Sequence, residues 1–141
     1  MVGSAVIRYL KSCGLEKIIV ENRKKLDLTN WNKTYKFIKK KKPDIVINCA
    51  GRVGGILDNY KYPKEFLTQN IYIQLNLIDA CLKNKIKTYI NLGSSCIYPK
   101  KARQPIKEDY LLSGKLEYTN EAYALAKIVG LKSCEYYNRQ F

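Results

Sequence analysis

The sequence predicts an α/β fold in which helices cover a parallel sheet. Residues 44–49 form a nearly continuous apolar run, which is typical of a parallel strand that is buried on both faces. Such runs alternate with segments whose apolar residues recur every three or four positions, as they do in helices. The 141 residues, 46% of them hydrophobic, are enough for one modest core, so we expect a single domain over residues 1–141.

The first expected element is an amphipathic helix. Its apolar residues recur at helical spacing: Val2, Val6, Tyr9, Leu10 and Cys13. Gly14 follows them and suits the C-terminal cap, where a left-handed backbone is common. A short apolar strand is expected next, over residues 17–20.

The polar turn 21–25 follows that strand, where a dinucleotide-binding fold contacts the adenosine ribose. An NAD enzyme usually has an acidic side chain there, whereas a 2′-phosphate needs cations. Arg23 and Lys24 therefore favour NADP, while Glu21 in the same turn keeps NAD open.

The second expected helix begins after Asn30, a good N-cap residue, and ends before Pro43. Its last turn carries Lys39 to Lys42, which suits the negative end of the helix dipole. The strand 44–49 then leads into the glycine-rich turn 50–55, where a ligand can approach the backbone closely.

The second half of the chain repeats the alternation of helix and strand. We expect a long apolar helix over residues 63–84, a strand over 88–92, and a loop over 99–117 whose length is typical of an active-site lid. A last helix, capped by Thr119 or Asn120, runs to the chain end. Small residues recur one turn apart on it and predict tight packing: Ala126, Gly130 and Cys134.

The chain is strongly basic, with 26 Lys and Arg against 12 Asp and Glu and a net charge of +14. Such a charge can mean nucleic-acid binding. We prefer the interpretation that lysine-rich helix faces are solvated and that the positive field attracts small anionic ligands. Nucleic acid is therefore an unlikely partner.

No segment resembles a signal peptide or a membrane span of about 20 apolar residues, so we expect no membrane partner. The five cysteines include no Cys-x-x-Cys pair. This pattern predicts reduced thiols in a cytoplasmic protein, with neither disulfides nor a metal site.

A candidate catalytic set lies where the strand 88–92 ends. Ser94 follows that strand, and Tyr123 and Lys127 stand one turn apart on the last helix, about 5–6 Å apart at Cβ. An ammonium beside a phenol is expected to lower the phenol's pKa, so that Tyr123 can exchange a proton with a carbonyl oxygen that the Ser94 hydroxyl holds. Cys96 adds a second proton-transfer group or nucleophile.

These residues resemble the Ser-Tyr-Lys set of the extended short-chain dehydrogenases/reductases. The surrounding sequences are similar, more narrowly, to the GDP-L-fucose synthase family: residues 49–56, 92–100, 119–127 and 134–140. The resemblance runs along the whole chain but covers only part of that family's usual length. It implies a partial, Rossmann-like, doubly wound parallel sheet.

The resemblance also implies a function. The family converts GDP-4-keto-6-deoxy-D-mannose to GDP-L-fucose with NADPH, by epimerisation and reduction. The resemblance also implies a homodimer for the full-length protein. Ser94, Cys96, Tyr123 and Lys127 are the implied catalytic residues. The residues implied to contact NADP are Met1, Val2, Gly3, Arg23, Leu26, Leu92, Gly93, Ser94, Ser95 and Lys127.

The sequence departs from the family in three ways. Gly3 is the only glycine left of the nucleotide-binding fingerprint, and the strand before it is missing. The chain ends at the last helix, without the substrate lobe, and it contains no histidine, although the family pairs its cysteine with one. We therefore expect a fragment, truncated at both ends, that does not complete the reaction.

Without the first strand, we expect the strands near Ile18 and Ile45 to be unable to pair with the strand near Ile90. Two alternatives stay open for the function. One is another nucleotide-sugar epimerase or reductase with the same Ser-Tyr-Lys set. The other is a non-catalytic remnant that binds partners through its basic surface.

Overall fold

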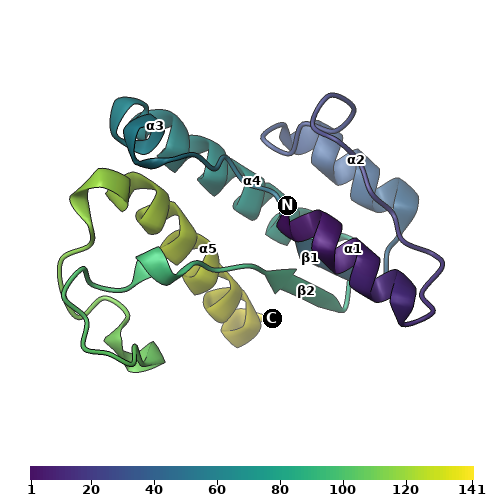
Figure 1. Ribbon diagram of the computed structural model, residues 1–141. Coiled ribbons are helices and arrows are strands. Elements are labelled where there is room, and N and C mark those ends of the chain that lie inside the picture. Colours follow the sequence, from purple (N-terminus) through teal and green to yellow (C-terminus); the bar gives the residue numbers. More distant parts are fainter.

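The computed structural model describes all 141 residues. Its helices and strands occur in the order α1 (Val2–Ser12), α2 (Trp31–Lys41), β1 (Ile45–Asn48), α3 (Ile56–Lys61), α4 (Pro63–Lys83), β2 (Thr88–Asn91) and α5 (Glu121–Gln140). Figure 1 shows both strands near the middle of the molecule, with the loop between β2 and α5 extending away from them. None of the helices is long and apolar enough to cross a membrane.

The two strands form one parallel sheet, in which Ile45 pairs with Thr88 and Asn48 pairs with Asn91. The α/β fold is therefore confirmed, but the expectation that the strand near Ile45 cannot pair with the strand near Ile90 is wrong. The chain passes from β1 through α3 and α4 to β2, and parallel strands joined by such a helical crossover commonly lie side by side.

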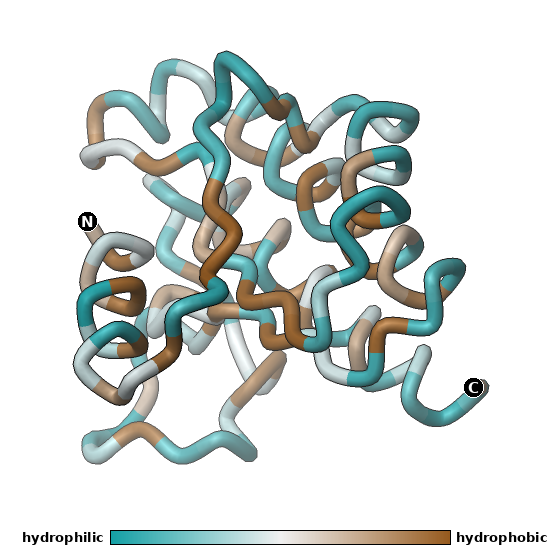
Figure 2. Tube along the Cα trace, turned by 90° about the vertical axis from the view of Figure 1, so that its right-hand side faces the viewer, coloured by the Kyte–Doolittle hydropathy of each residue, from teal (hydrophilic) through white to brown (hydrophobic).

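The strand expected over residues 17–20 is also absent. A strand exists through hydrogen bonds to a neighbouring strand, and the sheet contains only β1 and β2. Instead, the Ile18 amide donates to the nearby Glu16 carbonyl, and Ile19 and Val20 remain 45% and 54% exposed. Figure 2 faces this side of the molecule and shows a hydrophobic stretch in the foreground, between α1 and α2.

The expected ends of the first two helices are confirmed. Gly14 follows α1 with a left-handed backbone, φ +82°. The Asn30 side chain accepts a hydrogen bond of 3.0 Å from the Lys33 amide at the start of α2. At the other end of α2, Lys42 has φ +44° and Pro43 follows, so the helix stops where the sequence predicts.

Helix α4 is the centre of the molecule because it packs against both α2 and α5. The core between α2 and α4 is a small cluster of Ile38, Ile73, Leu77 and Ala80. The short helix α3, which the sequence did not predict, precedes α4 directly.

Helix α5 packs along α4 through small residues, as expected. Ala126 and Gly130 are buried, and the Gln74 side chain of α4 occupies the space above Gly130. A Cβ atom at Gly130 would overlap the Gln74 side-chain amide, so only glycine permits this approach. The tight contact fixes the face of α5 on which Tyr123 and Lys127 stand.

Candidate active site

The predicted catalytic residues come together where the carboxyl end of β2 meets the first turns of α5. Leu92 to Ser94 leave the strand at this point, and a 3₁₀ turn over Ser95–Ile97 follows. Tyr123 and Lys127 lie on the adjoining face of α5, with the Lys127 Nζ atom 5.8 Å from the centroid of the Tyr123 ring.

Lys127 is held with its ammonium group against the end of β2. Its side chain is buried, and Nζ donates a hydrogen bond of 2.9 Å to the Leu92 carbonyl. Burial lowers the pKa of Lys127, and the neighbouring thiols of Cys96 and Cys49 oppose this effect. The lysine side chain is therefore buried and held in place against the end of β2.

The pKa of Tyr123 shifts in the direction opposite to the one expected from the sequence. Burial raises it, the neighbouring Cys96 raises it further, and a hydrogen bond with Ser94 lowers it. The net shift is therefore opposite to the expected one, because burial outweighs any stabilisation of the phenolate by the Lys127 ammonium, which is hydrogen-bonded to the Leu92 carbonyl. Tyr123 therefore keeps its proton at neutral pH, as a proton donor must.

Ser94 lies between the thiol and the phenol. The Cys96 Sγ atom donates to the Ser94 Oγ atom at 3.1 Å, and Ser94 also interacts with the Tyr123 hydroxyl. All four predicted catalytic residues thus form one cluster. This cluster can hold a carbonyl oxygen between two hydroxyl groups and has a thiol beside it.

The residues expected to contact the cofactor occupy three places. Leu92, Gly93, Ser94, Ser95 and Lys127 belong to the cluster itself. Met1, Val2 and Gly3 form the beginning of α1, and a Cβ atom at Gly3 would lie 3.4 Å from Cys49 Cβ, just beyond β1. Arg23 and Leu26 lie in the turn after residues 17–20, where Arg23 donates to Gln69 of α4 at 3.2 Å.

These residues fit a dinucleotide in two respects. The first turn of α1 has no acidic residue and no side-chain cap, so its amide groups are free for a phosphate. A Cβ atom at Gly93 would meet no atom within 4 Å, which leaves open space beside the cluster.

One residue near the site, Arg52, is absent from the predicted set. Its guanidinium lies 4.9 Å from the centroid of the Phe66 ring, and Phe66 packs edge-on against Tyr123 at 6.4 Å. The sequence signal that could have identified it is an arginine in the glycine-rich turn directly after a buried strand.

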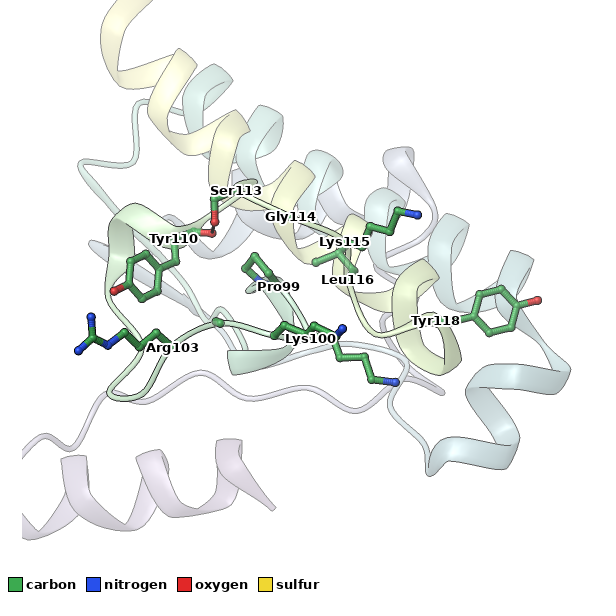
Figure 3. Close-up of a pocket in the computed structure, with 11 residues that line it drawn as sticks. Pro99, Lys100, Arg103, Tyr110, Ser113, Gly114, Lys115, Leu116 and Tyr118 are labelled. Atoms are coloured by element: carbon green, nitrogen blue, oxygen red, sulfur yellow. Dashed lines mark hydrogen bonds between the residues drawn. The ribbon is translucent and has the colours of Figure 1, made fainter.

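A cavity of about 680 Å³ lies within the loop that joins β2 to α5, apart from the catalytic cluster. Its lining is basic, with Lys100, Lys101, Arg103 and Lys115, but Figure 3 shows the side chains of Arg103, Lys100 and Lys115 extending in different directions. Lys100 is already paired with Glu117 at 2.7 Å. These cations therefore do not converge on a single anion, and the role of the loop as a lid stays a prediction.

Comparison with known proteins identifies close relatives. The chain is 50% identical to the GDP-L-fucose synthase of Sinorhizobium fredii over 141 residues, which cover all of this chain and 45% of the relative. It is 44% identical to the GDP-L-colitose synthase of Yersinia pseudotuberculosis over 99% of this chain and 45% of the relative. The chain thus spans less than half the length of these relatives.

Solved structures share the fold. A GDP-mannoheptose C4 reductase from Campylobacter jejuni with NADP bound has a TM-score of 0.94 at 35% identity, covering 99% of this chain and 44% of that one. A GDP-L-fucose synthetase from Naegleria fowleri bound to NADP has a TM-score of 0.88 at 29% identity, covering 98% and 44%.

The sequence over residues 1–141 also matches the family described as the NAD dependent epimerase/dehydratase family. The Rossmann-like α/β fold and the cluster of serine, tyrosine and lysine agree with this match. The chain belongs to the NAD dependent epimerase/dehydratase family.

Proposed function

We propose that these 141 residues form a single domain, the cofactor-binding and proton-transfer part of an enzyme that uses NADPH to convert GDP-4-keto-6-deoxy-D-mannose to GDP-L-fucose. The observation that carries the proposal is the cluster of Ser94, Cys96, Tyr123 and Lys127 at the end of β2. The names of the relatives that match along the whole chain support the choice of substrate.

Tyr123 is the proton donor for reduction. Its raised pKa keeps the phenol protonated, and the Ser94 hydroxyl helps to hold the C4 oxygen of the substrate beside it. NADPH, when bound, supplies the hydride. After proton donation, the Lys127 ammonium stabilises the phenolate that is left.

Cys96 exchanges protons in the epimerisation. The C4 carbonyl acidifies the hydrogens on the two flanking carbons, because the electron pair left by proton removal moves onto the C4 oxygen. Ser94 and Tyr123 hydrogen-bond that oxygen as its charge increases. A base takes the proton from one face of the carbon and an acid returns a proton to the opposite face; Cys96 is one of these two groups, and the other is the histidine that the family pairs with the cysteine and that these 141 residues lack. The Cys96 thiol donates a hydrogen bond of 3.1 Å to the Ser94 hydroxyl, so it lies next to the place where the C4 oxygen would bind.

For the cofactor, we propose that the beginning of α1 (Met1, Val2 and Gly3) contacts a phosphate, and that Arg23 and Leu26 contact the adenosine end. The residues after β2 (Leu92, Gly93, Ser94 and Ser95) and Lys127 contact the nicotinamide end. Arg23 with Lys24 favours the 2′-phosphate of NADP over NAD. NADP in related structures supports this choice.

We further propose a cytoplasmic homodimer without a nucleic-acid or membrane partner. Five free cysteines support a reducing compartment. The basic surface of the chain suits small anionic ligands such as NADP and GDP-sugars.

A second candidate is another reductase or epimerase of GDP-sugars. The observation in its favour is that the similar proteins include a GDP-L-colitose synthase and a GDP-mannoheptose C4 reductase. Trials with several GDP- and UDP-keto-sugars would separate this candidate from the first.

The test is a hybrid enzyme in which these 141 residues replace the matching segment of the Sinorhizobium fredii relative. Tyr123→Phe should lower the rate of NADPH oxidation with the keto-sugar by about two orders of magnitude or more, since a general acid is lost. Tyr136→Phe is the matched control, because Tyr136 lies on the same helix and is 49% exposed. Full activity in the Tyr123→Phe hybrid would exclude Tyr123 as the proton donor.

A further inference from the structure

We propose that the Arg52 guanidinium is a binding group for a diphosphate, either that of the dinucleotide or that of the nucleotide-sugar. The identity of the ligand rests on the proposed function, whereas the site itself rests on the geometry of Arg52.

Arg52 carries a charge that the chain leaves without a partner. The structure has two ion pairs, Lys100–Glu117 and Lys132–Glu135, and Arg52 belongs to neither. Its Nε atom is buried and has no hydrogen-bond partner. Burying a donor without a partner destabilises the folded chain, so an arginine in this state is better explained by ligand binding than by stability.

The side chain is fixed in advance of binding. Its guanidinium lies over two aromatic rings, 4.9 Å from the centroid of Phe66 and 5.6 Å from that of Tyr62. Such cation–π contacts hold the charge without neutralising it. Anion binding would therefore cost little conformational entropy in the Arg52 side chain.

The backbone of Arg52 is fixed as well. The Asn70 side chain of α4 accepts from the Arg52 amide at 2.8 Å and donates to the Arg52 carbonyl at 3.0 Å. Asn70 is only 2% exposed, and a Cβ atom at Gly51 would lie 2.9 Å from its Oδ1 atom. The turn is thus built around Asn70 and needs glycine before the arginine.

The position of Arg52 indicates the class of ligand. Arg52 follows β1 by four residues, at the edge where α/β sheets bind nucleotides, and Phe66 links its guanidinium to the Tyr123 ring. The guanidinium fork matches two phosphate oxygens. NADP and a GDP-sugar both carry a diphosphate, so the experiment must separate the two.

The test follows the arginine Nε–H signals of this chain by NMR. The chain has five arginines, so the Arg52 signal can be assigned by its loss in Arg52→Gln. Inorganic pyrophosphate, NADP⁺ and GDP are titrated in turn. The proposal predicts a saturable shift of the Arg52 signal with pyrophosphate and an affinity about tenfold or more lower in Arg52→Gln. Tighter binding of NADP⁺ than of GDP would identify the cofactor as the ligand, and the reverse would identify the substrate.

Arg103→Gln is the matched control, since Arg103 is an exposed arginine on the loop between β2 and α5 and should not affect binding. Arg52→Lys keeps the charge but loses the fork, and it should bind pyrophosphate with intermediate affinity. The amide spectrum of each variant reports whether it is folded. An unmoved Arg52 signal, or equal pyrophosphate affinity in Arg52→Gln and the parent chain, overturns the proposal.

The hybrid enzyme separates this proposal from the proposed function. If Arg52 binds pyrophosphate but the hybrid does not reduce the keto-sugar, the proposed substrate is wrong and the anion site stands. If the hybrid is active and Arg52→Gln leaves the KM for NADPH and the KM for the keto-sugar unchanged, the anion site is wrong and the proposed function stands.

Discussion

At the scale of single residues, the contact between Gln74 and Gly130 determines how closely α5 approaches α4. The Gln74 Nε2 atom donates to the Ala126 carbonyl at 2.9 Å, and its Oε1 atom accepts from Asn91 at 3.0 Å. Ala126 precedes Lys127, and Asn91 precedes Leu92, the residue that Lys127 contacts. One buried amide therefore connects α4 to both sides of the candidate active site.

Gly130→Ala should reduce the free energy of unfolding by about 1–3 kcal/mol, because the new methyl group would occupy the space of the Gln74 amide. Urea denaturation of the parent chain and the variant measures this difference. The double variant Gln74→Ala/Gly130→Ala should show strong coupling between the two changes, since truncating Gln74 frees the space that the added methyl group needs. Additive effects would mean that the two residues do not compete for this space.

At the scale of secondary-structure elements, helix α2 depends on a local cap and on its packing against α4. Asn30 caps its first turn, and Ile38 is buried against Ile73 and Leu77. The Asn76 side chain of α4 also donates to the Leu28 carbonyl at 2.8 Å, which fixes the segment that leads into the helix.

Asn30→Ala should reduce the free energy of unfolding by about 1 kcal/mol, since the Lys33 amide loses its acceptor. Asn22→Ala is the matched control, because Asn22 makes the same kind of bond, to the Lys25 amide, in an exposed turn outside any helix. Chemical denaturation of both variants checks the prediction. An equal decrease in the free energy of unfolding in the two variants would show that the Asn30 cap does not stabilise helix α2 more than an ordinary turn bond does.

At the scale of the whole molecule, several buried groups hold their protons more tightly in the folded chain. Burial raises the pKa of Tyr89 and Tyr123, and that of the Cys81 thiol to about 11. A hydrogen bond to Asp79 raises the pKa of Tyr137 to about 12. The pKa of Lys127 shifts in the opposite direction, because burial lowers it.

The melting temperature should therefore fall as the pH rises above about 9–10, where thiols and phenols of an unfolded chain lose their protons. A group whose pKa is higher in the folded chain than in the unfolded chain stabilises the fold fully at pH values below its unfolded pKa. This stabilisation is lost as the pH rises through the pKa of the folded chain. Thermal denaturation between about pH 8 and pH 11 at constant ionic strength, about 0.1 M, measures this loss. Tyr137→Phe should weaken the dependence on pH and Tyr136→Phe should not, so identical profiles would contradict the assignment to Tyr137.

The sequence by itself determined helices α1, α2, α4 and α5, but not α3, and the pairing of Tyr123 with Lys127. The caps at Gly14 and Asn30 and the one-turn spacing of the pair depend on contacts between residues three or four positions apart, which a short segment contains in full. The position of Ser94 after a strand followed from the general rule that parallel strands present ligand-binding groups at their carboxyl ends.

Tertiary structure alone decided the strand pairing and the electrostatics of the site. The apolar run 17–20 has no neighbouring strand and stays irregular, while β1 pairs with β2. The pKa of Tyr123 increases because burial outweighs the hydrogen bond from Ser94, and Arg52 is left unpaired beside Phe66. A strand partner, a degree of burial and an absent counter-charge all depend on residues distant in the chain, so no local pattern in the sequence could reveal them.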